Sequence, residues 1–318
     1  MTSLAAPENL LALLVAHPGG VPETLVRASL GDTADPAATA LRARGHDLQY
    51  DADRWRLSCA PQHFDPVAFA RARRGPWGAP CEVWEVTGST NDLARAGALG
   101  GAPEGALWIA EEQTAGRGRQ GRTWCCGPHA GILASWIVRT PLAAEACPTL
   151  LPLAVGLGIC EGLRSATGLA VRTKWPNDLW LEGAKLAGIL VEARPGPQGF
   201  AVVGLGLNVY AEPQREAQIG GRSAHLALCG SGLRREALLA ALLAAAAGRV
   251  EEWRTGNRVD LLARWRQLDV TQGRAVRVEC GGETIAGRVV GIGESGCLAV
   301  ETAAGPVREF AAGEVHLS

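Results

Sequence analysis

The central part of this chain alternates between strand-like and helix-like stretches, and this alternation restricts its fold more than any other feature. Strands are expected over residues 81–86, 106–110, 131–138, 171–174, 179–182, 185–193 and 200–209. Helices are expected over residues 89–96, 150–167, 234–255 and 258–268, the first capped by Ser89-Thr90-Asn91. Such alternation over residues 81–268 predicts an α/β domain built on a central sheet.

The segments on either side follow other patterns. Apolar stripes within residues 8–45 predict three helices, the second opening at Pro22-Glu23 and the third capped by Asp35-Pro36 and ended by Gly45. Residues 47–58 then predict a short hairpin, so the N-terminal unit resembles a winged helix-turn-helix. Four short strands with Gly-rich turns over residues 276–311 are typical of a small β-barrel or sandwich.

A length of 318 residues suits two or three domains. We therefore expect a multidomain α+β and α/β chain, divided into a winged helix-turn-helix-like domain (residues 1–62), a linker rich in Pro, Arg and Gly (63–80), an α/β domain (81–268) and a β-rich domain (269–318).

Composition narrows the class of protein. The formal net charge of −1 gives no general attraction to nucleic acid or to an anionic membrane. The N-terminus lacks the basic and apolar regions of a signal peptide, and the longest apolar run, residues 237–248, is too short to span a bilayer. None of the nine cysteines forms a Cys-x-x-Cys pair, so no zinc or disulfide framework is indicated. These features favour a cytoplasmic protein without a membrane partner.

Lysine is almost absent from this chain. Of the 31 basic residues only Lys174 and Lys185 are lysine, and both lie in one stretch of twelve residues. Arginine serves everywhere else, so these two positions suggest a need for a compact, strongly hydrated ammonium group. That need indicates chemistry on a small anionic group.

A loop rich in Arg and Gly runs from Gln113 to Trp124. Arg117, Arg119 and Arg122 alternate with glycines, so backbone N–H groups and guanidinium groups can face phosphate oxygens. The Gly-x-Gly-x-x-Gly spacing in this loop lacks the acidic residue of a dinucleotide-binding fingerprint, so we reject that assignment. A flexible solvated loop and nonspecific binding of nucleic acid remain as alternatives.

The lysine stretch predicts a second part of the same site. Pro176 interrupts the strand, and Asn177 and Asp178 follow at the turn, where a carboxylate beside phosphates is a reasonable Mg²⁺ ligand. A two-residue turn at Gly183-Ala184 would place Lys185 and Asp178 on one face, about 10 Å apart. One ligand could then contact both side chains.

These motifs together resemble those of the biotin–protein ligases. The order and spacing agree over the whole central domain, and the flanking units match the three-domain bacterial form. The matching segments are Ser89-Thr90-Asn91, Gln113, Gly116 to Arg122, Trp124, Lys174-Trp-Pro-Asn-Asp178, Lys185-Leu-Ala-Gly-Ile-Leu and Gly204-Leu-Gly-Leu-Asn208.

The resemblance implies a two-step reaction. Biotin attacks the α-phosphate of ATP, giving biotinyl-5′-AMP and pyrophosphate, and a lysine of a biotin carboxyl carrier protein then takes the biotin and releases AMP. Mg-ATP, biotin and the adenylate are the implied ligands, and a homodimer through the central sheet is an implied assembly. The implied folds are a mixed-sheet catalytic domain like that of class II synthetases and a C-terminal SH3-like barrel.

The resemblance also implies a role for each matching residue. Lys185, Arg119, Lys174 and Asp178 would be catalytic, with Asp178 as the metal ligand and Asn177 near the metal or the adenylate. Ser89, Thr90 and Gln113 would bind the ureido group of biotin. The remaining implied binding residues are Asn91, Gly116, Arg117, Gly118, Arg122, Trp124, Gly188 (close approach of biotin to the strand) and Asn208 (nucleotide side).

Two departures from the family pattern matter. The expected recognition helix begins Pro36-Ala-Ala-Thr39 without base-reading side chains, and residues 1–60 hold five Arg against seven acidic residues, a net charge of −2. The architecture allows a biotin-operon repressor, but these residues argue against DNA as a partner. The family's C-terminal nucleotide-contacting Arg is replaced by Ser318, which leaves Arg308 and His316 as candidates.

Two other functions remain open. A lipoate–protein ligase would use the same adenylation chemistry, although the Arg-Gly loop and the Lys-Trp-Pro-Asn-Asp motif favour biotin. A biotin-responsive DNA-binding regulator would keep the ligand pocket without turnover, and the lysine pair and the weak recognition helix argue against it.

Overall fold

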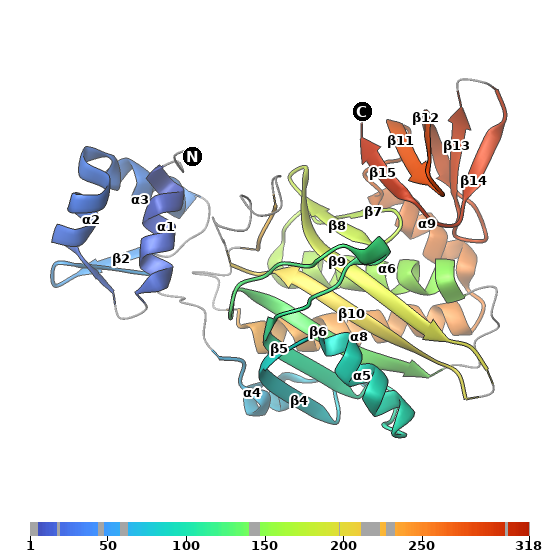
Figure 1. The fold of residues 1–318 in the computed structure, drawn as a ribbon, viewed down its shortest axis with the longest axis horizontal. Helices are drawn as coiled ribbons and strands as arrows, with labels where there is room; N and C mark the ends of the chain where they lie inside the picture. Colours follow the sequence, from blue (N-terminus) through green and yellow to red (C-terminus); the bar gives the residue numbers. More distant parts are fainter. Residues whose placement is uncertain are drawn as a thin grey trace.

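Three separate sheets organise the chain, as the computed structural model shows (Figure 1). The structure describes residues 6–17, 20–43, 48–57, 63–139, 147–196, 198–210, 223–226, 233–302 and 305–317. The first sheet lies in the N-terminal unit, the second forms the centre of the molecule, and the third belongs to the C-terminal segment.

The N-terminal unit contains the expected helices and hairpin. Its elements are α1 (Ala6–Ala16), β1 (Val21–Pro22), α2 (Glu23–Leu30), η1 (Gly31–Thr33), α3 (Ala34–Ala43), β2 (Leu48–Asp51) and β3 (Arg54–Leu57), with sheet order β1-β3-β2. Ala52 and Asp53 form the hairpin turn with positive φ angles of 48° and 57°. Helix α3 begins at Ala34, so Asp35 lies in its first turn and is not its cap, and Gly45 falls outside the described residues. A core of its own, centred on Leu10, Leu41 and Trp55, stabilises this unit.

The segment expected as a linker is partly helical, so that expectation was wrong. Helix α4 (Pro66–Ala72) begins after Asp65, whose side chain accepts hydrogen bonds from the N–H groups of Val67 (2.8 Å) and Ala68 (3.1 Å). Asp before Pro is a standard helix start that the Pro-rich composition obscured. Phe69 and Trp77 are buried in the core of the central sheet, so this segment packs as part of the central domain.

The central sheet is mixed and has the order β4-β5-β6-β10-β9-β8-β7. Strands β4 and β5 are parallel, and every other neighbouring pair is antiparallel. The strands are β4 (Cys81–Thr87), β5 (Leu107–Gln113), β6 (Gly131–Arg139), β7 (Arg172–Lys174), β8 (Asp178–Leu181), β9 (Ala184–Arg194) and β10 (Phe200–Asn208). All seven lie where the sequence predicted strands, within a few residues at each end.

Helices cover both faces of this sheet (Figure 1). Trp136 faces the large core formed with α6 (Cys147–Thr167), α8 (Arg235–Arg254) and α9 (Arg258–Leu268), while its neighbour Ile137 faces α5 (Thr90–Leu99). Because successive residues of a strand point to opposite faces, one strand serves two cores. No helix in the described part of the chain is long and apolar enough to cross a membrane.

The C-terminal sheet has five antiparallel strands in the order β14-β13-β12-β11-β15. They are β11 (Ala275–Cys280), β12 (Glu283–Ile292), β13 (Leu298–Thr302), β14 (Val307–Phe310) and β15 (Glu314–Leu317). The sequence predicted four strands and missed β15, because four residues after a glycine carry too little pattern. Pairing of β15 with β11 brings Glu314 to a cavity beside the central sheet.

The close packing of α6 on α8 gives a stability prediction. A Cβ atom at Gly158 in α6 would lie 2.6 Å from Cα of Ala246 in α8, whereas a Cβ at Gly248 in α8 would meet nothing within 4 Å. We expect Gly158→Ala to destabilise the protein by about 1–3 kcal/mol through overpacking. The control Gly248→Ala should stabilise it by about 0.5–1 kcal/mol, because alanine favours helix. Urea unfolding measures both, and equal effects would contradict this packing.

Candidate active site

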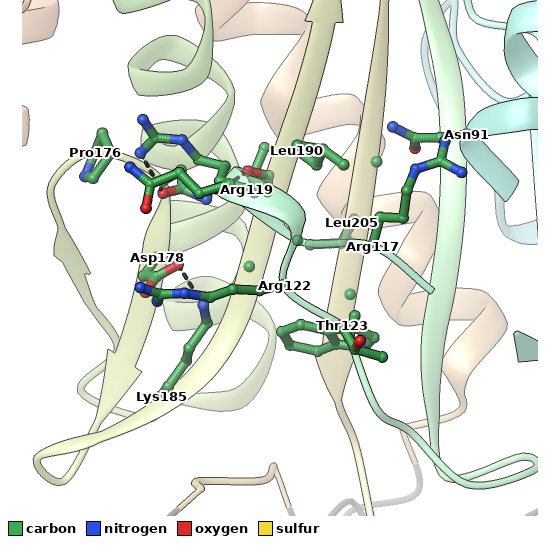
Figure 2. Close-up of a pocket in the computed structure, with 18 of the residues that line it drawn as sticks. Asn91, Arg117, Arg119, Arg122, Thr123, Pro176, Asp178, Lys185, Leu190 and Leu205 are labelled. Atoms are coloured by element: carbon green, nitrogen blue, oxygen red, sulfur yellow. Dashed lines mark hydrogen bonds and ion pairs between the residues drawn. The ribbon is translucent and has the colours of Figure 1, made fainter. Parts of the chain in front are cut away.

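One cavity collects side chains from six separate segments of the chain (Figure 2). The start of α5, the Arg-Gly loop, the turn between β7 and β8, strands β9 and β10, and the start of β15 all contribute. The cavity is lined by Ser89, Thr90, Asn91, Gln113, Arg117, Gly118, Arg119, Gln120, Arg122, Thr123, Trp124, Lys174, Trp175, Pro176, Asn177, Asp178, Lys185, Gly188, Ile189, Leu190, Gly204, Leu205, Gly206, Gly313, Glu314 and Val315.

A chain of buried hydrogen bonds forms one end of the cavity. The backbone N–H and Oγ1 of Thr90 donate to Oε1 of Gln113 (2.8 and 3.0 Å), and Oγ1 also lies 2.7 Å from Oγ of Ser135. Ser135 donates to Oδ1 of Asn91 (2.6 Å), and Nδ2 of Asn91 donates to Glu192 (2.6 Å). The polar groups are therefore fixed in one arrangement, as recognition of a neutral polar ligand requires.

The three arginines of the loop have different partners. Arg117 binds Asp92 through both nitrogens (2.6 and 2.8 Å) and holds the pKa of that carboxyl below its usual range. Arg119 donates to Oδ1 of Asn177 (3.1 Å), and Arg122 forms a salt bridge with Glu314. Figure 2 shows Arg117 turned toward Asn91 and Arg119 lying on the side of Pro176. The loop is thus tied at three points around the cavity.

Trp124 lies across two glycines of the sheet. Gly188 in β9 pairs with Gly206 in β10, and Cβ atoms built there would lie 3.1 and 2.3 Å from the indole ring. Any side chain at Gly206 would therefore displace the ring. Gly116 is needed for a similar reason, because its Cβ would lie 2.6 Å from the carbonyl oxygen of Trp124. Gly116 shapes the loop and does not line the cavity.

Lys185 and Asp178 form an ion pair of 2.7 Å, much closer than the expected separation of about 10 Å. The turn lies at Glu182-Gly183, both with positive φ, and not at Gly183-Ala184. Lys185 therefore pairs with Trp180. A bulge between this pair and the next shifts the register by one residue, so that Asp178 pairs with Gly188. This shifted register brings the two side chains together on one face.

Lys174 lies beside this pair, in surroundings that disfavour its positive charge. Its Nζ lies 4.4 Å from the ring centroid of Trp180, within cation–π distance. Burial lowers the pKa of Lys174, Asp178 opposes the lowering, and Lys185 adds to it. Burial also lowers the pKa of Arg119, which makes no salt bridge with a described carboxylate. This end of the cavity therefore has a surplus of positive charge that an anionic ligand would neutralise.

Two predicted residues hold the backbone of the site. Asn177 donates through Nδ2 to the carbonyl of Ile189 (2.8 Å) and accepts from its N–H (2.9 Å), which fixes the β7–β8 turn on β9. Asn208 is buried and donates to the carbonyls of Ala224 (2.9 Å) and Lys185 (3.4 Å). Within the described residues, Asn208 lies behind the lysine and outside the cavity lining.

The C-terminal sheet closes the cavity with an acid. Glu314 lines the cavity and binds Arg122, whereas Arg308 pairs with Glu283 (3.4 Å) and His316 lies 3.4 Å from Glu279. Neither Arg308 nor His316 belongs to the lining formed by the described residues, and Ser318 falls outside them.

Comparison with known proteins identifies the family. Residues 83–208 match the model of the Biotin/lipoate A/B protein ligase family, and residues 271–318 match that of the Biotin protein ligase C terminal domain. The biotin–[acetyl-CoA-carboxylase] ligase of Mycobacterium tuberculosis is 36% identical over 245 residues, covering 74% of this chain and 88% of that protein. The chain belongs to the biotin protein ligase family.

Two further relatives of this biotin protein ligase are informative. The bifunctional ligase/repressor BirA of Escherichia coli is 34% identical over 244 residues, covering 76% of this chain and 74% of that protein. The structure of the biotin protein ligase from Aquifex aeolicus in complex with biotin and ATP superposes with a TM-score of 0.63 at 24% identity, covering 76% and 99% of the two chains. This structural similarity shows that the two proteins share a fold.

The residues of this cavity suit a magnesium ion that takes most of its ligands from the bound substrates of the ligase. Asp178 offers one carboxylate, with Oδ1 engaged by Lys185, and no cluster of metal-ligating side chains includes it among the described residues. Mg²⁺ in nucleotide sites is commonly held by one or two carboxylates and by phosphate oxygens. The single carboxylate therefore fits a Mg-nucleotide and does not make a dedicated metal cage.

The sequence did not reveal three residues that meet the candidate site, Ser135, Glu192 and Glu314, and it did not reveal what Gly204 contacts. Ser135, Glu192 and Gly204 meet Asn91 from strands β6, β9 and β10, and Glu314 meets Arg122 from a strand about 190 residues further on. A Cβ at Gly204 would lie 2.2 Å from Oδ1 of Asn91. The Gly-x-Gly-x-Asn segment carried this signal, but its partner could not be named without the sheet order.

The buried hydrogen-bond chain gives a second stability prediction. Replacing Ser135 with alanine removes a donor to Asn91 and a neighbour of Thr90, both of which are buried. We expect Ser135→Ala to cost about 1–3 kcal/mol of unfolding free energy, the typical penalty for an unsatisfied buried polar group. Thr114→Ala, at an exposed hydroxyl, should stay within about 0.5 kcal/mol of the parent. A loss at Ser135 no larger than at Thr114, by urea unfolding, would refute this role.

Proposed function

We propose that this chain is an ATP-dependent biotin–protein ligase whose reaction centre is the group Lys174, Asp178, Lys185 and Arg119. The observation that carries the proposal is the surplus of positive charge around one carboxylate, at one end of a cavity whose other end is a fixed set of neutral polar groups. Biotin has a carboxylate at one end and a neutral ureido group at the other, so it matches both ends of this cavity.

The first step joins two anions. A carboxylate oxygen of biotin forms a bond to the α-phosphorus of ATP while the bond from that phosphorus to the leaving oxygen breaks, and pyrophosphate departs with the electron pair. Positive groups that are already in place lower the cost of this approach and of the charge that develops. Lys185 would exchange Asp178 for the biotin carboxylate and the reacting phosphate, since its ammonium group lies at the cavity.

Lys174 and Arg119 would complete the cationic surface. Both are disfavoured as buried cations without a ligand, so each gains when phosphate oxygens arrive. Asp178 would be the protein ligand of Mg²⁺, which supplies charge neutralisation on the phosphates when bound. Asn177 would hold Arg119 and the turn in position.

The neutral end of the cavity would bind biotin. Thr90, Gln113 and Ser89 would pair with the ureido group, since they lie together and Thr90 is already oriented by Gln113. The bicyclic ring of biotin would lie beside the Trp124 ring, which itself packs on Gly188 and Gly206.

The Arg-Gly loop would act as a lid. In the second step the neutral amine of the carrier lysine attacks the anhydride carbonyl, AMP departs with the electron pair, and the nitrogen loses a proton. Water would compete for the same carbonyl, so the intermediate must be covered until the carrier arrives. Arg119 to Asn177 and Arg122 to Glu314 are contacts that would keep the loop closed.

The remaining parts of the proposal concern architecture and partners. We place a winged helix-turn-helix-like domain at residues 1–62, the catalytic domain at 81–268 and an SH3-like domain at 269–318, with α4 packed on the catalytic domain. The acceptor would be a biotin carboxyl carrier protein in the cytoplasm, and pairing through the central sheet would give a homodimer. The exposed acids Asp51 and Asp53 lie in the expected wing, which weighs against DNA binding.

The ligase is tested by transfer of labelled biotin to a biotin carboxyl carrier domain with Mg-ATP. Lys185→Ala should lower the rate roughly 10²–10³-fold, the usual effect of removing one group that stabilises developing charge. Arg308→Ala also removes one cation, but from outside the cavity, and should leave the rate unchanged.

Three outcomes separate the competing functions. Transfer of lipoate in preference to biotin would identify a lipoate–protein ligase. Tight biotin binding without labelling by the parent protein would identify a sensor. Equal rates for the parent protein and Lys185→Ala would remove Lys185 from the reaction centre.

The lid gives a separate prediction. Arg119→Gly removes the hydrogen bond to Asn177 and adds a flexible residue, so the adenylate should escape before transfer. We expect a larger share of the biotinyl-5′-AMP formed without carrier to be free in solution and not bound to the protein, measured by chromatography of both fractions. Arg74→Gly, at an exposed arginine bonded only to the neighbouring carbonyls of Arg71 and Arg73, is the control. No difference between the two variants would contradict the lid role.

A further inference from the structure

A second cluster of ionisable side chains lies outside the catalytic cavity, where three distant segments meet. His63 precedes α4, Glu85 lies in β4, and His129 precedes β6. Nδ1 of His63 lies 3.1 Å from Glu85 Oε2, and Nε2 of His129 lies 3.6 Å from Glu85 Oε1. The two imidazole rings contact each other edge to face, with centroids 4.5 Å apart.

These distances suit one small dication. Imidazole and carboxylate ligands lie about 2.0–2.2 Å from Zn²⁺, so ligand atoms of a tetrahedral site lie roughly 3.3 Å from one another. His63, Glu111 and His129 each bring a ligand atom within 4.8 Å of the other two. Counting Glu85 and Glu111 against the neighbouring Arg235, the cluster has a net charge of −1 with neutral imidazoles. A cation is therefore favoured there.

The buried carboxylate of Glu111 lies beside His129. Glu111 is 2% exposed and receives both Arg235 nitrogens (2.8 and 3.0 Å), and its Oε2 lies 3.2 Å from Nδ1 of His129. The carboxylate of Glu111 thus lies on the Nδ1 side of the His129 ring, while Nε2 on the other side faces Glu85.

The backbone around His63 is also fixed in advance. The N–H of Phe64 donates to Glu111, and the N–H of Asp65 donates to Glu236 in α8 (2.8 Å). Phe64 itself is buried in the central core. His63 is 75% exposed and Glu85 60% exposed, so an ion could enter from solvent without opening the protein.

We propose that His63, Glu85 and His129 form a binding site for a transition-metal dication of the zinc class, with the buried carboxylate of Glu111 beside it. Two imidazoles select zinc, nickel or copper over magnesium, so Mg-ATP would not occupy the site. The bound ion would join the segment that follows the N-terminal unit to strand β4 and to the loop before β6, because its three ligands come from these places. The site is separate from the reaction centre and does not depend on the proposed function.

Zinc titration of the chelator-treated full chain tests this proposal. We expect one Zn²⁺ per chain by isothermal calorimetry, visible absorption of a four-coordinate ion when Co²⁺ replaces it, and a higher Tm with zinc. His63→Ala and Glu85→Gln alter exposed side chains, so both variants should fold. Each should weaken zinc binding at least about tenfold, because even the loss of a residue that only contacts a metal ligand typically costs about tenfold or more.

A matched control uses the second His-carboxylate cluster. Glu279, Glu314 and His316 also bring ligand atoms within 4.8 Å of one another. His316→Asn should leave the stoichiometry and affinity of zinc binding unchanged. If this variant instead lost zinc binding, the site would lie at that cluster and the proposal would be overturned. Binding that exceeds one ion per chain, or that is equal in the parent protein and His63→Ala, would mean adventitious surface binding only. Absence of binding, with native circular dichroism, would also overturn it.

Discussion

The turn at Glu182-Gly183 brings Lys185 and Asp178 together in an ion pair, and the proposed reaction centre is built on that pair. The turn at Glu182-Gly183 sets Lys185 opposite Trp180, and the bulge that follows returns Gly188 to a position opposite Asp178. Without the bulge, residues beyond it would face the other side of the sheet. Gly188 would then leave Trp124, and the wall of the cavity would lose its shape.

The turn between β7 and β8, directly after Lys174, is hydrogen bonded both to the central sheet and to the C-terminal segment. Nε1 of Trp175 donates to the carbonyl of Gly296 (3.0 Å) in the C-terminal sheet, while Asn177 is hydrogen bonded to Ile189 in the central one. Arg119 of the Arg-Gly loop adds a third contact with this turn through Asn177. Because rigid elements position charged groups more accurately than free loops, these contacts explain how a loop can present ammonium and guanidinium groups to phosphates.

The sequence could predict what depends on neighbours along the chain. Helix starts, strand positions, the Arg-Gly loop and the lysine stretch are local signals, and the seven central strands lie where they were expected. Register and partner choice depend on contacts distant in sequence, so the turn was misplaced by one residue and the lysine separation was too large. Ser135, Glu192 and Glu314 became visible only when β6, β9 and β15 were placed beside the motifs.

The junction of the last two segments argues that the C-terminal sheet belongs to the catalytic unit. Asp269 bridges to Thr173, directly before Lys174, and Val270 donates to the same residue (2.9 Å). Burial raises the pKa of Asp269, and its carboxylate accepts from the N–H (2.9 Å) and hydroxyl (2.7 Å) of Thr271. A buried carboxylate satisfied in this way fixes one backbone path. A displacement of the C-terminal sheet would therefore move β7 and, with it, the ammonium group of Lys174.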